Sequence, residues 1–291
     1  MNDKIQFTAE LSADIPEEIR KERNIATVGL QVHLEDKEYK DGDLSNQEVY
    51  DIFQARKALP STSAVSVGDY QDLFRPFLEA GKTVIHVSIS SGISSTYQNA
   101  CIAAEDLEDL GKVYVIDSLA LSQATSILVY KGLDMAEQDK SAEEIVAALK
   151  ELVTKLDSSF MITNLDFLKH GGRCSTLAAL GANLLKLKPM INMDGGSMST
   201  DKKYRGRDED AYFQYLDDRF ADGVAYDDEY VCISNGMVDQ AILDKAVSVL
   251  KKKYKFKNVI VNDVGTVIFA HGGKGCFGVF FLHQYKEFFE S

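Results

Sequence analysis

The sequence has 291 residues, 45% hydrophobic and 26% charged, a balance typical of one large or two medium globular domains with a substantial core. The formal net charge is −13, so we expect no nucleic-acid partner and at most transient contact with a membrane surface. Four cysteines with no CxxC pair argue against a zinc site and for a reducing compartment.

The location of the protein is indicated by two further features. The first ten residues, MNDKIQFTAE, hold no apolar run typical of a signal peptide, and no stretch approaches about 18 consecutive apolar residues. We therefore expect a cytoplasmic protein without a membrane span.

The dense basic stretch at Lys251–Lys253, with Lys255 and Lys257, is interpreted as solvated cations at the end of a helix.

In the first half, strand patterns alternate with helix patterns. Ser45 with Glu48, and Ser141 with Glu144, are capping boxes that mark two helix starts. The predicted elements are a strand over 25–34, a hairpin edge over Glu35–Lys40, helices over 46–57 and 67–80, a strand over Thr83–Ile89, a helix over 94–110, a strand over Lys112–Ile116, and helices over 119–137 and 142–156. This alternation predicts parallel βαβ units.

The second half contains a predicted hairpin, which favours a mixed sheet there. Its elements are a strand over 159–163, short helices near 165–169 and 175–186, strands Pro189–Met193 and Ser197–Tyr204 around the turn Asp194-Gly195-Gly196, a helix over 207–221, a strand over 229–234, a helix over 238–254, and strands over 257–262 and 264–270. We predict an α/β protein of two packed α/β domains, 1–157 with a mainly parallel sheet and 158–291 with a mixed sheet. No linker rich in proline or glycine separates them.

The segment Ser90–Thr96 is the most informative for chemistry. It joins an apolar strand to a helix and reads SSGISST. Ligands of open α/β sheets lie at the carboxyl ends of strands, and the first turn of a helix offers free N–H groups. Hydroxyls and a glycine added to this corner predict a site for a carboxylate or a phosphate. The alternative is that these serines only cap the helix.

Three weaker signals lie elsewhere in the chain. Ser61-Thr62-Ser63 is a second hydroxyl cluster after Pro60, although taken alone it is typical of an ordinary turn before a helix. His271 begins His-Gly-Gly-Lys-Gly, in which glycines allow close approach of a ligand, although a lone histidine is often structural. Arg173, Arg205 and Arg207 lie beside glycines, where surface arginines are common.

Several nucleotide, metal and hydrolase motifs are missing from the sequence. There is no GxxxxGK[ST], no GxGxxG after a strand, no HExxH and no EF-hand pattern. Gly92-Ile93-Ser94-Ser95-Thr96 lacks the second glycine of a GxSxG hydrolase motif. We therefore expect no catalytic residue, no metal and no cofactor.

In their joint order these segments resemble the DegV family, which includes the fatty-acid-binding subunits of bacterial fatty-acid kinases. The resemblance covers about residues 5–285. It is carried by Ala13–Pro16, Tyr39–Gly42, Pro60–Ser66, Ser90–Tyr97, Asp117-Ser118, Gly171–Arg173, Lys188-Pro189, His271–Gly275 and the aromatic segment Phe277–Phe281. The chain departs from the family pattern at Ala9–Ser12, at Ser95 and at Lys274, where the family has TDST-like, glycine and proline residues.

The resemblance implies a non-catalytic protein that holds a long-chain fatty acid. The carboxyl would be bound by Thr62, Ser94 and His271, with Ser63 and Ser95 as neighbours. Arg173, and Arg205 or Arg207, would face a kinase catalytic subunit or an acyl-phosphate. The partner kinase would use ATP to form the acyl-phosphate that feeds phospholipid synthesis.

The tail would need an apolar tunnel, and two other functions are compatible with the sequence. Plausible tunnel walls, in the second half, are Leu177, Leu180, Leu184, Leu185 and Met190, whose spacing equally suits a core. One alternative function is a serine hydrolase or acyltransferase that uses Ser94 and His271. The other is a regulatory module that binds a non-lipid anion.

Overall fold

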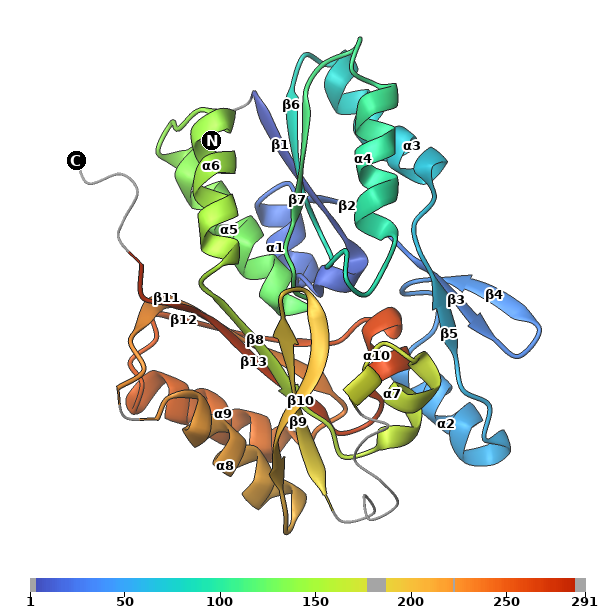
Figure 1. The fold of residues 1–291 in the computed structure, drawn as a ribbon, viewed down its shortest axis with the longest axis vertical. Coiled ribbons are helices and arrows are strands. Elements are labelled where there is room, and N and C mark those ends of the chain that lie inside the picture. Colours follow the sequence, from blue (N-terminus) through green and yellow to red (C-terminus); the bar gives the residue numbers. More distant parts are fainter. Residues whose placement is uncertain (1–3, 177–186, 222, 286–291) are drawn as a thin grey trace.

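A computed structural model describes residues 4–176, 187–221 and 223–285. The upper part in Figure 1 is a four-stranded parallel sheet in the order β2-β1-β6-β7. Its strands are β1 (Ile5–Glu10), β2 (Ala26–Val28), β6 (Thr83–Ser88) and β7 (Val113–Asp117). Helices α3 (Val67–Glu79) and α4 (Thr96–Asp106) cover one face, and α5 (Gln123–Glu137) and α6 (Ala142–Val153) cover the other.

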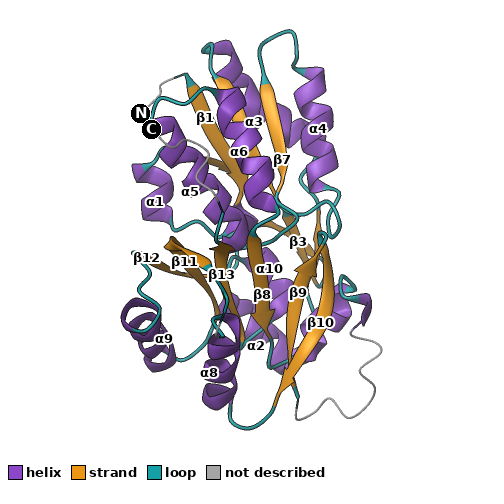
Figure 2. Ribbon diagram, turned by 60° about the vertical axis from the view of Figure 1, so that its left-hand side comes forward, coloured by secondary structure: helices purple, strands orange, loops and turns teal. Residues whose placement is uncertain are grey.

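The lower part is a six-stranded mixed sheet in the order β10-β9-β8-β13-β11-β12. Its strands are β8 (Leu156–Met161), β9 (Lys188–Asp194), β10 (Ser197–Tyr204), β11 (Tyr226–Gly236), β12 (Asn258–Asp263) and β13 (Cys276–His283). Helices α8 (Asp208–Arg219) and α9 (Gln240–Lys252) pack on its outer face, as Figure 2 shows. Helix α5 packs between the two sheets and is therefore buried along nearly its whole length. The predicted fold class is confirmed.

A three-stranded sheet, β4-β3-β5, joins the two halves. It consists of β3 (Gln31–Leu34), β4 (Lys37–Lys40) and β5 (Ser61–Ser63), with α2 (Asn46–Arg56), α7 (Leu165–Gly171) and α10 (Thr266–Gly272) packed nearby. Phe53 of α2 lies 4.8 Å from the ring of Phe167, which lies 5.7 Å from that of Phe269. Residues 31–63 of the first half therefore share a small core with helices of the second.

Most predicted elements are found close to their predicted bounds. Both capping boxes and the hairpin around Gly195 are present. The strand expected over 25–34 is divided into β2 and β3, and the helix near 175–186 lies almost entirely outside the described residues. Strands β1, β5 and β13 and the short helices η1 (Leu11–Ala13) and α1 (Glu17–Glu22) were not predicted.

The strand predicted over 264–270 is wrong, because this segment forms helix α10. Its apolar, β-branched residues are typical of a strand. The first N–H groups of the helix instead donate hydrogen bonds to carboxyl groups that are far away in the sequence. Gly265 N donates to Asp14 (2.7 Å), and Val267 N donates to Asp41 (3.1 Å). Carboxyl groups at a helix N-terminus satisfy its free donors and its dipole, so a tertiary contact decides the local structure.

Asp41 gives this helix start a pH dependence. Burial raises the pKa of Asp41 from 3.8 to about 6. A carboxyl whose pKa is raised on folding stabilises the fold at low pH, and that stability is lost as the pH rises through about 6. The difference corresponds to about 3 kcal/mol. We expect the free energy of unfolding of Asp41→Asn, measured in urea, to gain about 3 kcal/mol relative to that of the wild type between pH 3 and pH 7. Asp36→Asn, at an exposed turn, is the control, and parallel pH profiles for wild type and Asp41→Asn would contradict the assignment.

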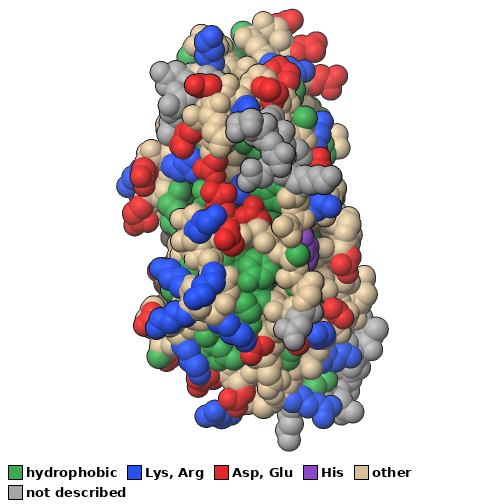
Figure 3. All heavy atoms as spheres, turned by 90° about the vertical axis from the view of Figure 1, so that its left-hand side faces the viewer, with side chains coloured by type: hydrophobic (Ala, Val, Ile, Leu, Met, Phe, Trp, Pro, Cys, Tyr) green, Lys and Arg blue, Asp and Glu red, His purple; other side chains and the backbone are tan. Residues whose placement is uncertain are grey.

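The basic stretch lies on the surface, as expected from its sequence. Lys251 and Lys252 occupy the last turn of α9, while Lys253 pairs with Asp217 at 2.7 Å. Figure 3 shows Lys and Arg side chains gathered beside a hydrophobic patch in the lower half of one face, with acidic side chains above. Within the described ranges, no helix is long and apolar enough to span a bilayer.

Candidate functional site

A largely apolar cavity lies where the three sheets meet. Its empty volume is about 730 Å³, a figure that includes solvent-filled space at the mouth. Its apolar walls come from both halves of the chain. The first half contributes residues such as Ile89, Ile93 and Leu121, and the second half contributes residues such as Phe160, Met198 and Phe280.

This arrangement differs from the predicted tunnel in the second half alone. Of the proposed wall residues, Leu177, Leu180, Leu184 and Leu185 lie outside the described part of the chain. Met190 is buried, but it belongs to the core formed with α8 and α9, on the other face of the mixed sheet. The difference arises because the face of the mixed sheet opposite to Met190 is the one turned toward α5 and the first half.

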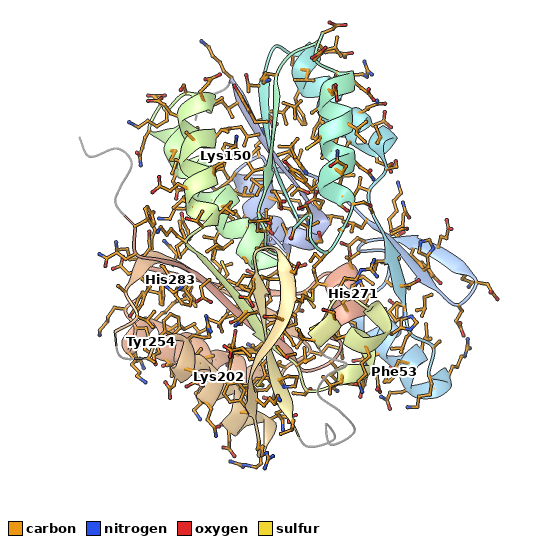
Figure 4. The ribbon with its side chains drawn as sticks, viewed as in Figure 1. Phe53, Lys150, Lys202, Tyr254, His271 and His283 are labelled. Atoms are coloured by element: carbon orange, nitrogen blue, oxygen red, sulfur yellow. The ribbon has the colours of Figure 1, made fainter. Side chains whose placement is uncertain are left out.

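Thr62 and His271 form the polar centre of the cavity. Thr62 lies on β5 and His271 in the last turn of α10, and Thr62 Oγ1 lies 2.8 Å from His271 Nε2. Figure 4 shows His271 beside α7, at the junction of the small sheet and the lower half. Burial, followed by the positive charges of Arg173 and His170, lowers the pKa of His271 to about 4. The imidazole is therefore neutral at neutral pH and can exchange one hydrogen bond with a hydroxyl or carboxyl group.

Close packing against a glycine fixes the orientation of the imidazole. His271 Nδ1 is buried and has no hydrogen-bond partner among the residues that the structure describes. It lies against the backbone of Gly171 in α7, where an added Cβ would be only 2.2 Å away. The ring is therefore held with Nδ1 toward α7 and Nε2 toward Thr62.

The predicted serines occupy different places around this centre. Ser94 lines the cavity, and its Oγ lies 2.6 Å from Thr96 Oγ1 while accepting the Thr96 N–H. Ser63 lies at the rim, with its hydroxyl 2.7 Å from His33 Nε2. Ser95 is exposed and lines no part of the cavity. The helix begins at Thr96, and this start decides which of two adjacent serines faces inward.

The three arginines are separated in the structure. Arg173 lines the cavity, and its Nη1 donates to Gly171 O at 2.6 Å. Arg205 is exposed, and Arg207 forms an ion pair with Asp210 at the start of α8. Neither lines the cavity, so of these three arginines only Arg173 places its charge beside Thr62 and His271.

Ser122 and Ser234 also line the cavity, and the sequence reading missed both. Ser122 follows β7 just as Ser90 follows β6. The rule that ligands lie at the carboxyl ends of strands could therefore have found it. Ser234 is within a strand and carried no such signal.

The geometry does not assemble a hydrolase triad at Ser94. The hydrogen bonds of Ser94 go to Thr96, while Nε2 of His271 goes to Thr62. Within the described part of the chain, His271 Nδ1 meets no carboxylate that would orient the ring as a base. Among the described residues, no cluster of three potential metal-binding side chains is present. The site is arranged to bind a ligand with a polar head and an apolar body.

This fold and cavity define a class of α/β binding proteins, and comparison with known proteins identifies the family. A model described as "Uncharacterised protein, DegV family" matches residues 4–284. The chain belongs to the DegV family, which confirms the resemblance seen in the sequence. A DegV domain-containing protein of Clostridium acetobutylicum is 31% identical over 284 residues, 97% of this chain and 100% of that protein.

Two solved structures share the fold over nearly their whole length. A DegV family protein of Thermus thermophilus, described by its fatty-acid binding, superposes with a TM-score of 0.86 at 25% identity, covering 97% of this chain and 100% of the other. A stearic-acid-binding protein of Eubacterium ventriosum gives 0.81 at 26% identity, covering 96% and 98%.

Proposed function

We propose that this protein is a cytoplasmic carrier that holds one long-chain fatty acid. The observation that carries the proposal is an apolar cavity with Thr62, Ser94, His271 and Arg173 on its wall. The solved relatives named for fatty-acid and stearic-acid binding support it. The carboxyl group would take hydrogen bonds from the Thr62 and Ser94 hydroxyls, with His271 holding Thr62 in place.

The energetics allow such a ligand. A chain of about 16 methylenes gains roughly 13 kcal/mol on burial, at about 0.8 kcal/mol each. Association costs on the order of 4–15 kcal/mol, so the tail can supply the affinity with a small surplus. A carboxylate buried without partners would remove that surplus. The hydroxyls at the head are therefore required for binding, although most of the free energy comes from the tail.

We further propose that the carboxylate is presented to a separate ATP-dependent kinase that forms the acyl-phosphate for phospholipid synthesis. The missing nucleotide-phosphate motif supports this division of labour, since phosphoryl transfer needs a nucleotide and Mg²⁺ site. Arg173, the arginine on the cavity wall, would lie near the carboxyl group and the incoming phosphoryl group.

The experiment that tests the carrier function is solvent extraction of the purified protein followed by mass spectrometry. We expect about one long-chain acid, C14–C18, per protein molecule. Recovery of only phosphate or a small acid would support a non-lipid anion-binding module instead. Adding a fatty-acid kinase catalytic subunit and ATP should convert the bound acid to an acyl-phosphate. No conversion by any such kinase would reject the second part of the proposal.

Gly171→Ala should weaken fatty-acid binding, because the new methyl would lie 2.2 Å from His271 Nδ1 and force the imidazole to move. We expect at least about a tenfold loss of affinity in a fluorescent fatty-acid displacement assay, equivalent to one charged hydrogen bond. The matched control is Gly68→Ala, also in a helix, where the nearest atom to a new Cβ is 3.9 Å away. Equal affinities for the two variants would show that the imidazole position does not matter.

A further inference from the structure

Two further hydroxyl groups, those of Ser122 and Ser234, line the cavity. Helix α10 runs between these hydroxyls and the Thr62–His271 pair. At its start, Gly265 N donates to Asp14, and Asp14 accepts the hydroxyl of Ser122. His271 lies in its last turn, six residues later and therefore about 9 Å along the helix axis. A fatty acid with its carboxyl at His271 would reach Ser122 with the middle of its chain.

Ser122 is held toward the cavity at a conformational cost. Its φ of 53° and ψ of −145° lie in a region that favours glycine. It occupies the N-cap position of α5, yet its side chain makes no capping hydrogen bond. The hydroxyl instead bonds Asp14 and lies 2.7 Å from Ser234 Oγ on β11. The ordinary reason for a serine at this position, helix capping, is therefore absent.

The hydroxyl pair has hydrogen-bonding capacity left for a ligand. Ser122 donates to Asp14 and accepts from Ser234, while Gln123 Nε2 reaches Ser234 Oγ at 3.3 Å. Each hydroxyl has one proton and two lone pairs, so each keeps one free lone pair. If Asp14 is protonated, the chain reverses and the Ser234 proton becomes free. Burial raises the pKa of Asp14 well above its usual range, which favours that state.

We propose that Ser122 and Ser234 form a second polar subsite, which lets the protein bind fatty acids with a hydroxyl or keto group in mid-chain. The inference rests on the proposed function, because it needs the carboxyl to lie at His271. An apolar tunnel rejects such chains, since burying an unpaired hydroxyl costs about 1–3 kcal/mol. Here the two serines offer either a donor or an acceptor.

The test compares octadecanoic acid with 10-hydroxyoctadecanoic acid in displacement of a fluorescent fatty acid. We expect the wild type to bind the two acids within about threefold of each other. Ser234→Ala should bind the hydroxy acid about tenfold more weakly than the plain acid, the effect of one lost hydrogen bond. Ser118→Ala is the control, because Ser118 is a buried serine in the loop that carries Ser122 but does not line the cavity.

The outcomes separate this inference from the proposed function. If the wild type binds octadecanoic acid but discriminates tenfold or more against the hydroxy acid, the subsite is rejected and the carrier function stands. The same holds if Ser234→Ala leaves the ratio unchanged. If neither acid displaces the probe, both proposals fall. Should Ser234→Ala fail to fold, Ser122→Gly removes a hydroxyl at a backbone position that suits glycine, and the same change in ratio is expected.

Discussion

Glu10→Ala is expected to lower the free energy of unfolding by about 3–5 kcal/mol, since it leaves several buried hydrogen-bond donors without their acceptor. Glu10 and His86 are both fully buried beneath α3, with His86 Nε2 2.8 Å from Glu10 Oε1. Glu10 also accepts hydrogen bonds from Tyr70, Ser88 and Ile89 N. Removing the carboxylate leaves these donors, and the imidazole, buried without an acceptor.

The electrostatics of the pair agree with this expectation. Burial alone would raise the pKa of Glu10, but the charge of His86 and the donors around it hold that pKa below its usual value. The carboxylate is thus ionised, and its contribution to stability is present at neutral pH and lost on acidification below the usual range of a glutamate. Urea unfolding at neutral pH measures the effect. Glu17→Ala, which removes an exposed ion pair with Lys21, should leave the stability close to that of the wild type, and an equally small loss for Glu10→Ala would contradict the account.

The double variant Thr62→Ala and Ser94→Ala is expected to lose its bound lipid while remaining folded. Each hydroxyl that bonds the carboxylate contributes about 1.5 kcal/mol or more, so the two together should lower affinity by roughly 100-fold. Both side chains are only half buried and lie in or beside short loops, so the fold does not depend on them. Native mass spectrometry of the purified variants measures occupancy directly.

Ser91→Ala is the control for this experiment, since Ser91 is exposed in the same loop and does not line the cavity. It should keep the occupancy of the wild type. Full occupancy in the double variant would mean that the carboxyl group is held elsewhere.

Local signals were sufficient for much of the fold. Ser45 with Glu48 and Ser141 with Glu144 form their capping boxes within four residues, so the sequence alone predicts both helices. By contrast, β1 was overlooked although Gln6, Thr8 and Glu10 alternate with apolar residues, a pattern that predicts a strand with one face exposed to water. These polar side chains are buried and satisfied by distant partners such as His86. Helix α10 was misjudged because Asp14 and Asp41 cap it from the far end of the chain.

The candidate site shows the same division between local and tertiary information. The corner after β6 was predicted from strand, hydroxyls and glycine, and Ser94 lines the cavity as that rule suggests. Nothing local places Thr62 beside His271, 209 residues later, because that contact requires β5 to pack near α10. Ser234 could not be predicted for a similar reason, because its neighbour Ser122 comes from the other half of the chain.

The most direct test of the central claim is a crystal structure of the protein as purified from its bacterial host. We predict an acyl chain in the cavity between the sheets, with carboxyl oxygens within hydrogen-bond distance of the Thr62 and Ser94 hydroxyls. A chain that runs in the opposite direction, with its carboxyl at Ser122, or a lipid bound outside this cavity, would contradict the account.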